Sequence, residues 1–118
     1  MSDDEELSRS DYISIIKNKK KPLFVKFTAS WCGPCKKIKQ TVDDFLSSAD
    51  SSKIQYLEID IDNSIDVYAF LKSKRMVNGV PTLMFYSMSD KDYPPKLSVS
   101  TGSIEVVQKF INTMVASI

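Results

Sequence analysis

Hydrophobic and polar positions along the chain predict helices and strands in alternation. Helices are predicted over residues 8–20, 34–48, 64–74 and 104–115. Short apolar or alternating runs predict strands over residues 23–27, 54–61, 82–87 and 96–100. The spacing behind these predictions is a 3.6-residue period for a helix with one buried face, and a period of two for a half-buried strand.

Polar caps and prolines set the ends of the predicted helices. Ser8 or Ser10 can cap the first helix, and Pro22 ends it. Pro34 falls in the first turn of the second helix, where its missing N–H costs nothing. Ser64 is expected to cap the third helix.

The order of the predicted elements indicates an α/β fold. Strands alternate with helices in the first half, and two strands follow one another near the end. This order favours a mixed sheet with helices on both faces, parallel in its first half and with a terminal antiparallel hairpin. We expect one domain over residues 1–118, with an acidic, flexible segment at residues 1–6.

Composition excludes several classes of function. Sixteen Lys and Arg residues nearly balance fifteen Asp and Glu residues, which gives no support for a nucleic-acid or membrane partner. There is no histidine, so imidazole catalysis and histidine-bound zinc are excluded. The acidic start is unlike a signal peptide, and no apolar run is long enough to cross a bilayer. We therefore expect a cytoplasmic protein.

The candidate chemistry lies in the segment Cys32-Gly33-Pro34-Cys35, between a predicted buried strand and a predicted helix. Two intervening residues allow the two sulfur atoms to approach disulfide distance. At the helix N-terminus, free N–H groups and the helix dipole favour a Cys32 thiolate. Cys35, one turn further on, is expected to be more buried. An exposed attacking thiolate and a shielded second thiol suit thiol–disulfide exchange.

Other interpretations of a single CxxC pair are half of a metal site or two incidental buried thiols. A second CxxC pair is absent from the sequence, so one chain cannot form a closed four-ligand site, and no metal is expected. A dimer that bridges zinc or an iron–sulfur cluster through two such pairs stays open as an alternative.

Two sequence motifs resemble those of thioredoxins. Residues 27–36 read FTASWCGPCK, which is similar to the thioredoxin active-site segment, and Val80-Pro81-Thr82 is similar to a second signature of that family. The resemblance extends over residues 7–114. It implies a thioredoxin fold with a central mixed sheet of four to five strands, and a cis peptide bond before Pro81 facing the dithiol.

The resemblance also assigns roles to individual residues. Cys32 would be the nucleophile and Cys35 the resolving thiol of a redox-active disulfide. Asp62 would support the site by a hydrogen bond to the Trp31 indole. The residues expected to line the groove for client backbone are Trp31, Gly33, Pro34, Val80, Pro81 and Gly102.

The implied function is a protein-disulfide reductase that works through Cys32 and Cys35. Its partners would be oxidised client proteins and a thioredoxin reductase-like protein, with the chain acting as a monomer. No cofactor would be bound, and this electron transport would draw on NADPH through the reductase. The alternatives are a disulfide isomerase or oxidase, and a redox-inert binding module with the same fold.

The sequence departs from the thioredoxin pattern at Lys26. Thioredoxins typically have a buried Asp there, which takes the proton of the resolving cysteine. Lys26 lies in a predicted strand, and Glu58 occupies the same face of the next one. We hypothesise that Glu58, held by Lys26, replaces the missing acid and accepts the proton of Cys35. The alternative is that Lys26 extends to solvent and Glu58 is a surface residue.

Overall fold

The computed structural model describes residues 6–118, so the predicted flexible segment lies outside it except for Glu6. The order of elements is the predicted one. The elements are α1 (Arg9–Asn18), β1 (Leu23–Thr28), α2 (Gly33–Ser48), β2 (Gln55–Asp60), α3 (Ile65–Ser73), β3 (Thr82–Tyr86), β4 (Leu97–Ser100) and α4 (Ile104–Ala116).

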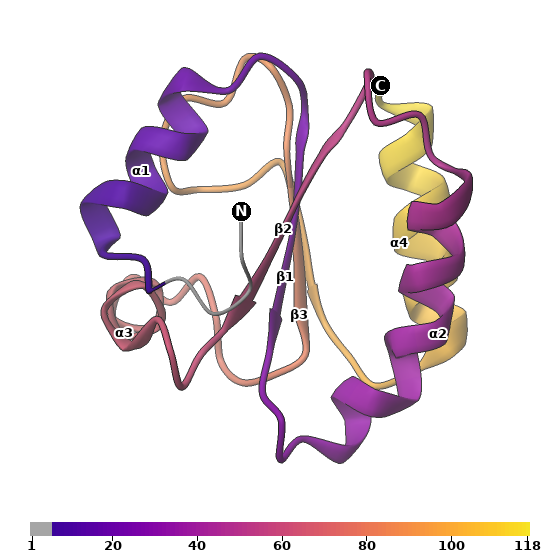
Figure 1. The fold of residues 1–118 in the computed structure, drawn as a ribbon, viewed down its shortest axis with the longest axis horizontal. Helices are drawn as coiled ribbons and strands as arrows, with labels where there is room; N and C mark the ends of the chain where they lie inside the picture. Colours follow the sequence, from indigo (N-terminus) through magenta and orange to yellow (C-terminus); the bar gives the residue numbers. More distant parts are fainter. Residues whose placement is uncertain (1–5) are drawn as a thin grey trace.

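A four-stranded mixed sheet forms the centre of the molecule (Figure 1). Its strand order is β2-β1-β3-β4, with β1 and β2 parallel and the other neighbours antiparallel. The predicted parallel first half and antiparallel terminal hairpin are therefore confirmed. In the β1–β2 register, Lys26 lies directly opposite Glu58.

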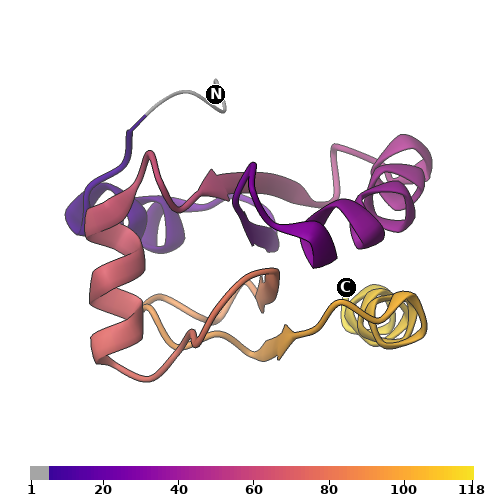
Figure 2. The same cartoon turned by 90° about the horizontal axis from the view of Figure 1, so that it is seen from below.

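Helices cover both faces of the sheet. Figures 1 and 2 show α1 and α3 together on one side, and α2 and α4 on the other. The side chains of β1 alternate between two cores, because successive strand residues point to opposite faces. Val25 packs with the core under α1 and α3, and Phe24 packs with the core under α2 and α4.

A side-chain cap begins α1 as the sequence predicts, but the predicted cap of α3 is absent. The Ser8 hydroxyl accepts a hydrogen bond from the Asp11 N–H, and the Asp11 carboxylate accepts one from the Ser8 N–H. Ser64 precedes α3 without capping it through its side chain. Its hydroxyl accepts instead from the Leu7 N–H at 3.1 Å, so this buried serine ties the segment before α1 to the start of α3.

Within residues 6–118, every helix falls short of the length and apolar character that a bilayer crossing demands.

Candidate active site

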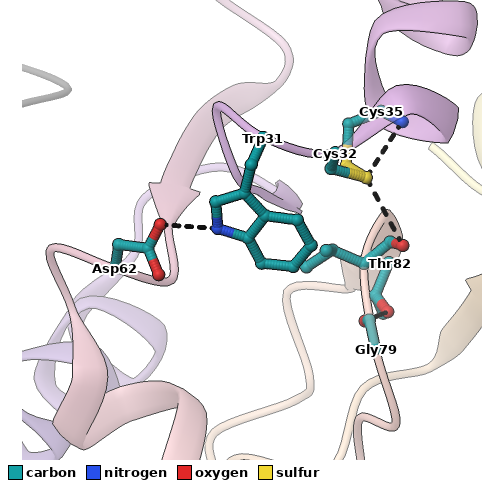
Figure 3. The surroundings of a disulfide bond; sticks show 7 residues. Trp31, Cys32, Cys35, Asp62, Gly79 and Thr82 are labelled. Carbon is teal, nitrogen blue, oxygen red and sulfur yellow. Dashed lines mark hydrogen bonds between the residues drawn. A yellow bond between two sulfur atoms is a disulfide. The ribbon is translucent and has the colours of Figure 1, made fainter.

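The dithiol segment occupies the turn from β1 into α2. Cys32 is the N-cap residue of α2 and forms a disulfide with Cys35, with their Cα atoms 5.2 Å apart. The Cys32 sulfur accepts a hydrogen bond from the Cys35 N–H at 3.2 Å (Figure 3). A backbone N–H at the helix N-terminus thus points at the Cys32 sulfur, where it would stabilise the negative charge of a thiolate.

The predicted difference in burial between the two cysteines is wrong for this disulfide-bonded form. Cys32 is 3% exposed and Cys35 is 5% exposed. Both pack with Ala29, Ile61 and Val80, which together close over the disulfide. The two cysteines therefore differ in hydrogen bonding at the helix N-terminus and not in residue exposure.

The segment before β3 faces the disulfide. The peptide bond between Val80 and Pro81 is cis, as the resemblance implied, and the Val80 carbonyl oxygen lies 3.7 Å from the Cys32 sulfur. The Thr82 hydroxyl donates to the Gly79 carbonyl at 2.7 Å, which braces this turn (Figure 3). Gly79 has φ of 125°, a left-handed conformation that favours glycine.

Trp31 is an exposed aromatic residue next to the disulfide. Its side chain is 65% exposed, although large apolar groups are usually buried. The indole N–H donates to the Asp62 carboxylate at 2.8 Å, which confirms the contact that the resemblance implied. In Figure 3 the indole ring lies between Asp62 and the two cysteines. An ordered, exposed aromatic surface at this place can contact an incoming protein.

Gly102, just before α4, lies against Pro34. A Cβ atom on Gly102 would be 2.8 Å from the Pro34 Cβ, whereas one on Gly33 would meet nothing within 4 Å. The structure thus brings Gly102 to the rim of the disulfide site, together with Trp31, Cys32, Pro34 and Val80.

Lys26 and Glu58 form an ion pair behind the disulfide. The Lys26 ammonium is 3.0 Å from Glu58 Oε1, and their side chains are 4% and 28% exposed. Lys26 therefore does not extend to solvent, which excludes that alternative. The Tyr56 hydroxyl donates to the same carboxylate oxygen at 2.8 Å. The contact with Glu58 gives a partner to the ammonium of Lys26, which would otherwise be costly to bury.

A cavity of about 350 Å³ connects this ion pair with Cys35. Sequence reasoning did not anticipate several residues of its lining, although strand alternation places Thr28 and Asp60 on the same face as Lys26 and Glu58. The full lining is Lys26, Thr28, Ala29, Ser30, Cys35, Lys36, Lys39, Glu58 and Asp60. Among the side chains of residues 6–118, no group of three or more His, Cys, Asp or Glu is placed to hold a metal ion.

A family model and two relatives that match this chain all point to the same family. A family model described as Thioredoxin matches residues 4–113. The chain is 37% identical to the thioredoxin of Ictalurus punctatus over 71 residues, which is 60% of this chain and 63% of that protein. It is 35% identical to thioredoxin-2 of Saccharomyces cerevisiae over 79 residues, 67% of this chain and 70% of the relative. These alignments thus span about two thirds of the relatives' lengths.

The fold has a close counterpart among solved structures. The germline-specific thioredoxin Deadhead of Drosophila melanogaster superposes with a TM-score of 0.67, covering 97% of this chain and 99% of that one. Its sequence identity is 24%, so this likeness concerns the fold.

Proposed function

The chain belongs to the thioredoxin family, and from this membership we propose that it is a thiol–disulfide oxidoreductase that reduces disulfides in client proteins. The observation that supports this most directly is the Cys32–Cys35 disulfide, placed at the N-terminus of α2 and beside the cis Val80–Pro81 bond.

The proposed reaction is a two-step exchange. In the reduced protein, the Cys32 thiolate attacks one sulfur of a client disulfide, and the other client sulfur leaves as a thiolate. Cys35 then loses its proton and attacks the Cys32 sulfur of the mixed disulfide. The second client sulfur leaves, and the Cys32–Cys35 bond forms, so two electrons pass to the client. The Cys35 N–H on the Cys32 sulfur supports Cys32 as the first nucleophile.

We propose that the client segment lies along the rim of this site. Trp31 offers an exposed ring on one side, and Gly33, Pro34 and Gly102 form the other. The backbone of Val80, before Pro81, lies against the disulfide and can pair with an extended client strand. Because both cysteines are nearly buried, the client disulfide has to enter between these residues.

The oxidised protein needs an external reductant to turn over. We propose that a thioredoxin reductase-like partner restores the dithiol with electrons from NADPH, and that the chain binds no cofactor of its own. A monomer in the cytoplasm, where thiols are kept reduced, suits this cycle. No nucleic-acid or membrane partner enters this proposal.

Reduction of insulin by dithiothreitol tests the function. The wild-type protein is expected to accelerate precipitation of the reduced insulin chains, and Cys32→Ser is expected to abolish the acceleration. A binding module with incidental thiols would give the same rate as dithiothreitol alone, and that result would refute the proposal. Turnover with NADPH and candidate reductases then tests the electron source.

A further inference from the structure

The cavity behind the disulfide bears on how Cys35 loses its proton, a step for which the proposed exchange names no proton acceptor. Cys35 must lose its proton before it can attack the mixed disulfide, yet it is 5% exposed and has little access to bulk water. The cavity borders Cys35 and its lining includes several charged and hydroxyl-bearing residues, so a group that takes this proton is expected among them.

Only two of the cavity's lining residues are carboxylates, Glu58 and Asp60. Lys26, Lys36 and Lys39 also line it, but an ammonium group has no lone pair with which to accept a proton. Asp60 Oδ1 accepts the Asp62 N–H at 2.9 Å, in the turn that follows β2. Glu58 instead pairs with the buried Lys26 at 3.0 Å, so it is the carboxylate held in the ion pair beside Cys35.

The contacts of Glu58 leave one of its oxygen atoms available. Within residues 6–118, the Lys26 ammonium and the Tyr56 hydroxyl both contact Oε1. At 28% exposure the side chain also reaches solvent, so a proton taken up inside the cavity can be released outside. Lys39 on α2 faces the same carboxylate: its pKa is raised, chiefly by Asp43 and to a smaller extent by Glu58.

We propose that Glu58 accepts the Cys35 proton, directly or through a water molecule in the cavity, while Cys35 attacks the mixed disulfide. The Cys35 S–H bond breaks as the bond to the Cys32 sulfur forms, and the client sulfur leaves as a thiolate. Glu58 then passes the proton to solvent, and Lys26 holds the carboxylate in place throughout. This proposal rests on the proposed function, because it concerns the second step of that exchange.

The two steps can be separated with the chromogenic disulfide dithiobis(nitrobenzoic acid). Attack by Cys32 on this probe releases one equivalent of coloured thiolate, and attack by Cys35 on the resulting mixed disulfide releases the second. Stopped-flow absorbance of the reduced protein therefore gives a rate for each step. Wild type, Glu58→Gln, Glu58→Asp and Asp60→Asn are compared, with thermal unfolding to show that each variant is folded.

Glu58→Gln is expected to slow the second release by about tenfold or more near pH 6, while the first release keeps its rate. The difference should shrink at alkaline pH, because hydroxide can then take the Cys35 proton in place of Glu58. Glu58→Asp, which keeps a carboxylate, should recover most of the rate. Asp60→Asn, at the same cavity, should match wild type.

Two results would overturn the proposal. One is a second release in Glu58→Gln that is as fast as in wild type, or faster, at every pH. The other is an equal loss in Asp60→Asn, which would mean that negative charge in the cavity matters and not Glu58 itself. Wild-type protein that releases no second equivalent would instead contradict the proposed function, so the two failures are distinguishable.

Discussion

Gly102 shows how one residue without a side chain shapes the rim of the site. Its α-carbon lies so close to Pro34 that an added Cβ would be 2.8 Å from the proline Cβ. The proline ring cannot rotate away, because it is bonded to its own backbone and sits in the first turn of α2. A larger residue would therefore push the segment before α4 away from the disulfide.

Gly102→Ala is expected to lower the free energy of unfolding by about 1–3 kcal/mol, as overpacking typically does. Urea denaturation measures this change, and the insulin assay should show slower reduction as the rim is displaced. Gly33→Ala is the matched control, because its Cβ would meet no atom within 4 Å. Equal losses of stability in the two variants would contradict the steric explanation.

The sequence identified most residues of the site, but it did not indicate how deeply the cysteines are buried. The CxxC spacing and the helix start located Cys32 and Cys35, and the resemblance implied the Trp31–Asp62 contact that the structure contains. The burial of Cys32 depends on packing with Ala29, Ile61 and Val80, which lie in three separate segments. Local patterns do not report such contacts between distant segments.

At the level of elements, the pairing of β1 with β2 creates the Lys26–Glu58 contact. Parallel register sets the two residues side by side, and both point toward α2. Lys26 is 4% exposed, whereas Glu58 keeps 28% exposure. Loss of the lysine would thus leave a carboxylate that water can partly solvate, which is less costly than a fully buried unpaired charge.

Lys26→Ala is expected to lower the free energy of unfolding by about 1–3 kcal/mol, between the values for exposed and for buried pairs. Chemical denaturation measures it, and a double-mutant cycle with Glu58→Gln isolates the coupling between the two side chains. Lys37→Ala, at an exposed position on α2, is the control and should change little. A Lys26→Ala variant as stable as this control would contradict a stabilising buried pair.

A pair of buried tyrosines joins α1 to β3. The hydroxyl groups of Tyr12 and Tyr86 are 2.9 Å apart, and the Tyr86 hydroxyl donates to the Tyr93 carbonyl at 2.7 Å. Burial raises the pKa of Tyr12 well above its usual value, and burial also raises the pKa of Tyr86. The folded protein thus keeps these protons at a pH at which the unfolded chain loses them.

Stability is therefore expected to fall as the pH rises above about 10, the usual tyrosine pKa, because the unfolded state then binds fewer protons. Below that pH the contribution of the pair is fully present. Tyr12→Phe removes one of the two groups, so its stability should fall less steeply in the same range. Urea denaturation from about pH 8 to about pH 11 measures both slopes. Equal slopes would contradict a contribution of the buried Tyr12 hydroxyl to the pH dependence of stability.

Local patterns predicted the elements well where caps and periodicity agree. The capping box at Ser8 is an example, because its partner Asp11 is three residues away and visible in the sequence. Ser64 has the residue type of a cap, but its hydroxyl accepts from Leu7, 57 positions away. The sequence offers no signal for that contact, since it arises only when α1 and α3 pack on the same face of the sheet.

For the whole molecule, the order of elements determines which chemistry can assemble. The alternation of strands and helices predicted the mixed sheet and its parallel half, and the resemblance implied the rest of the thioredoxin fold. This topology brings the end of β1, the start of α2 and the start of β3 together around one disulfide. The cavity could not be predicted, because it depends on how α2 packs over β1 and β2.

Capture of the mixed disulfide shows which of the two thiols attacks the client first. Reduced Cys32→Ser and Cys35→Ser variants are incubated with insulin, and peptide mass spectrometry locates any covalent adduct. An insulin adduct is expected on Cys32 in the Cys35→Ser variant, where no resolving thiol is present, and none is expected in Cys32→Ser. An adduct on Cys35 in Cys32→Ser, with none on Cys32 in the other variant, would contradict the assignment of the two thiols.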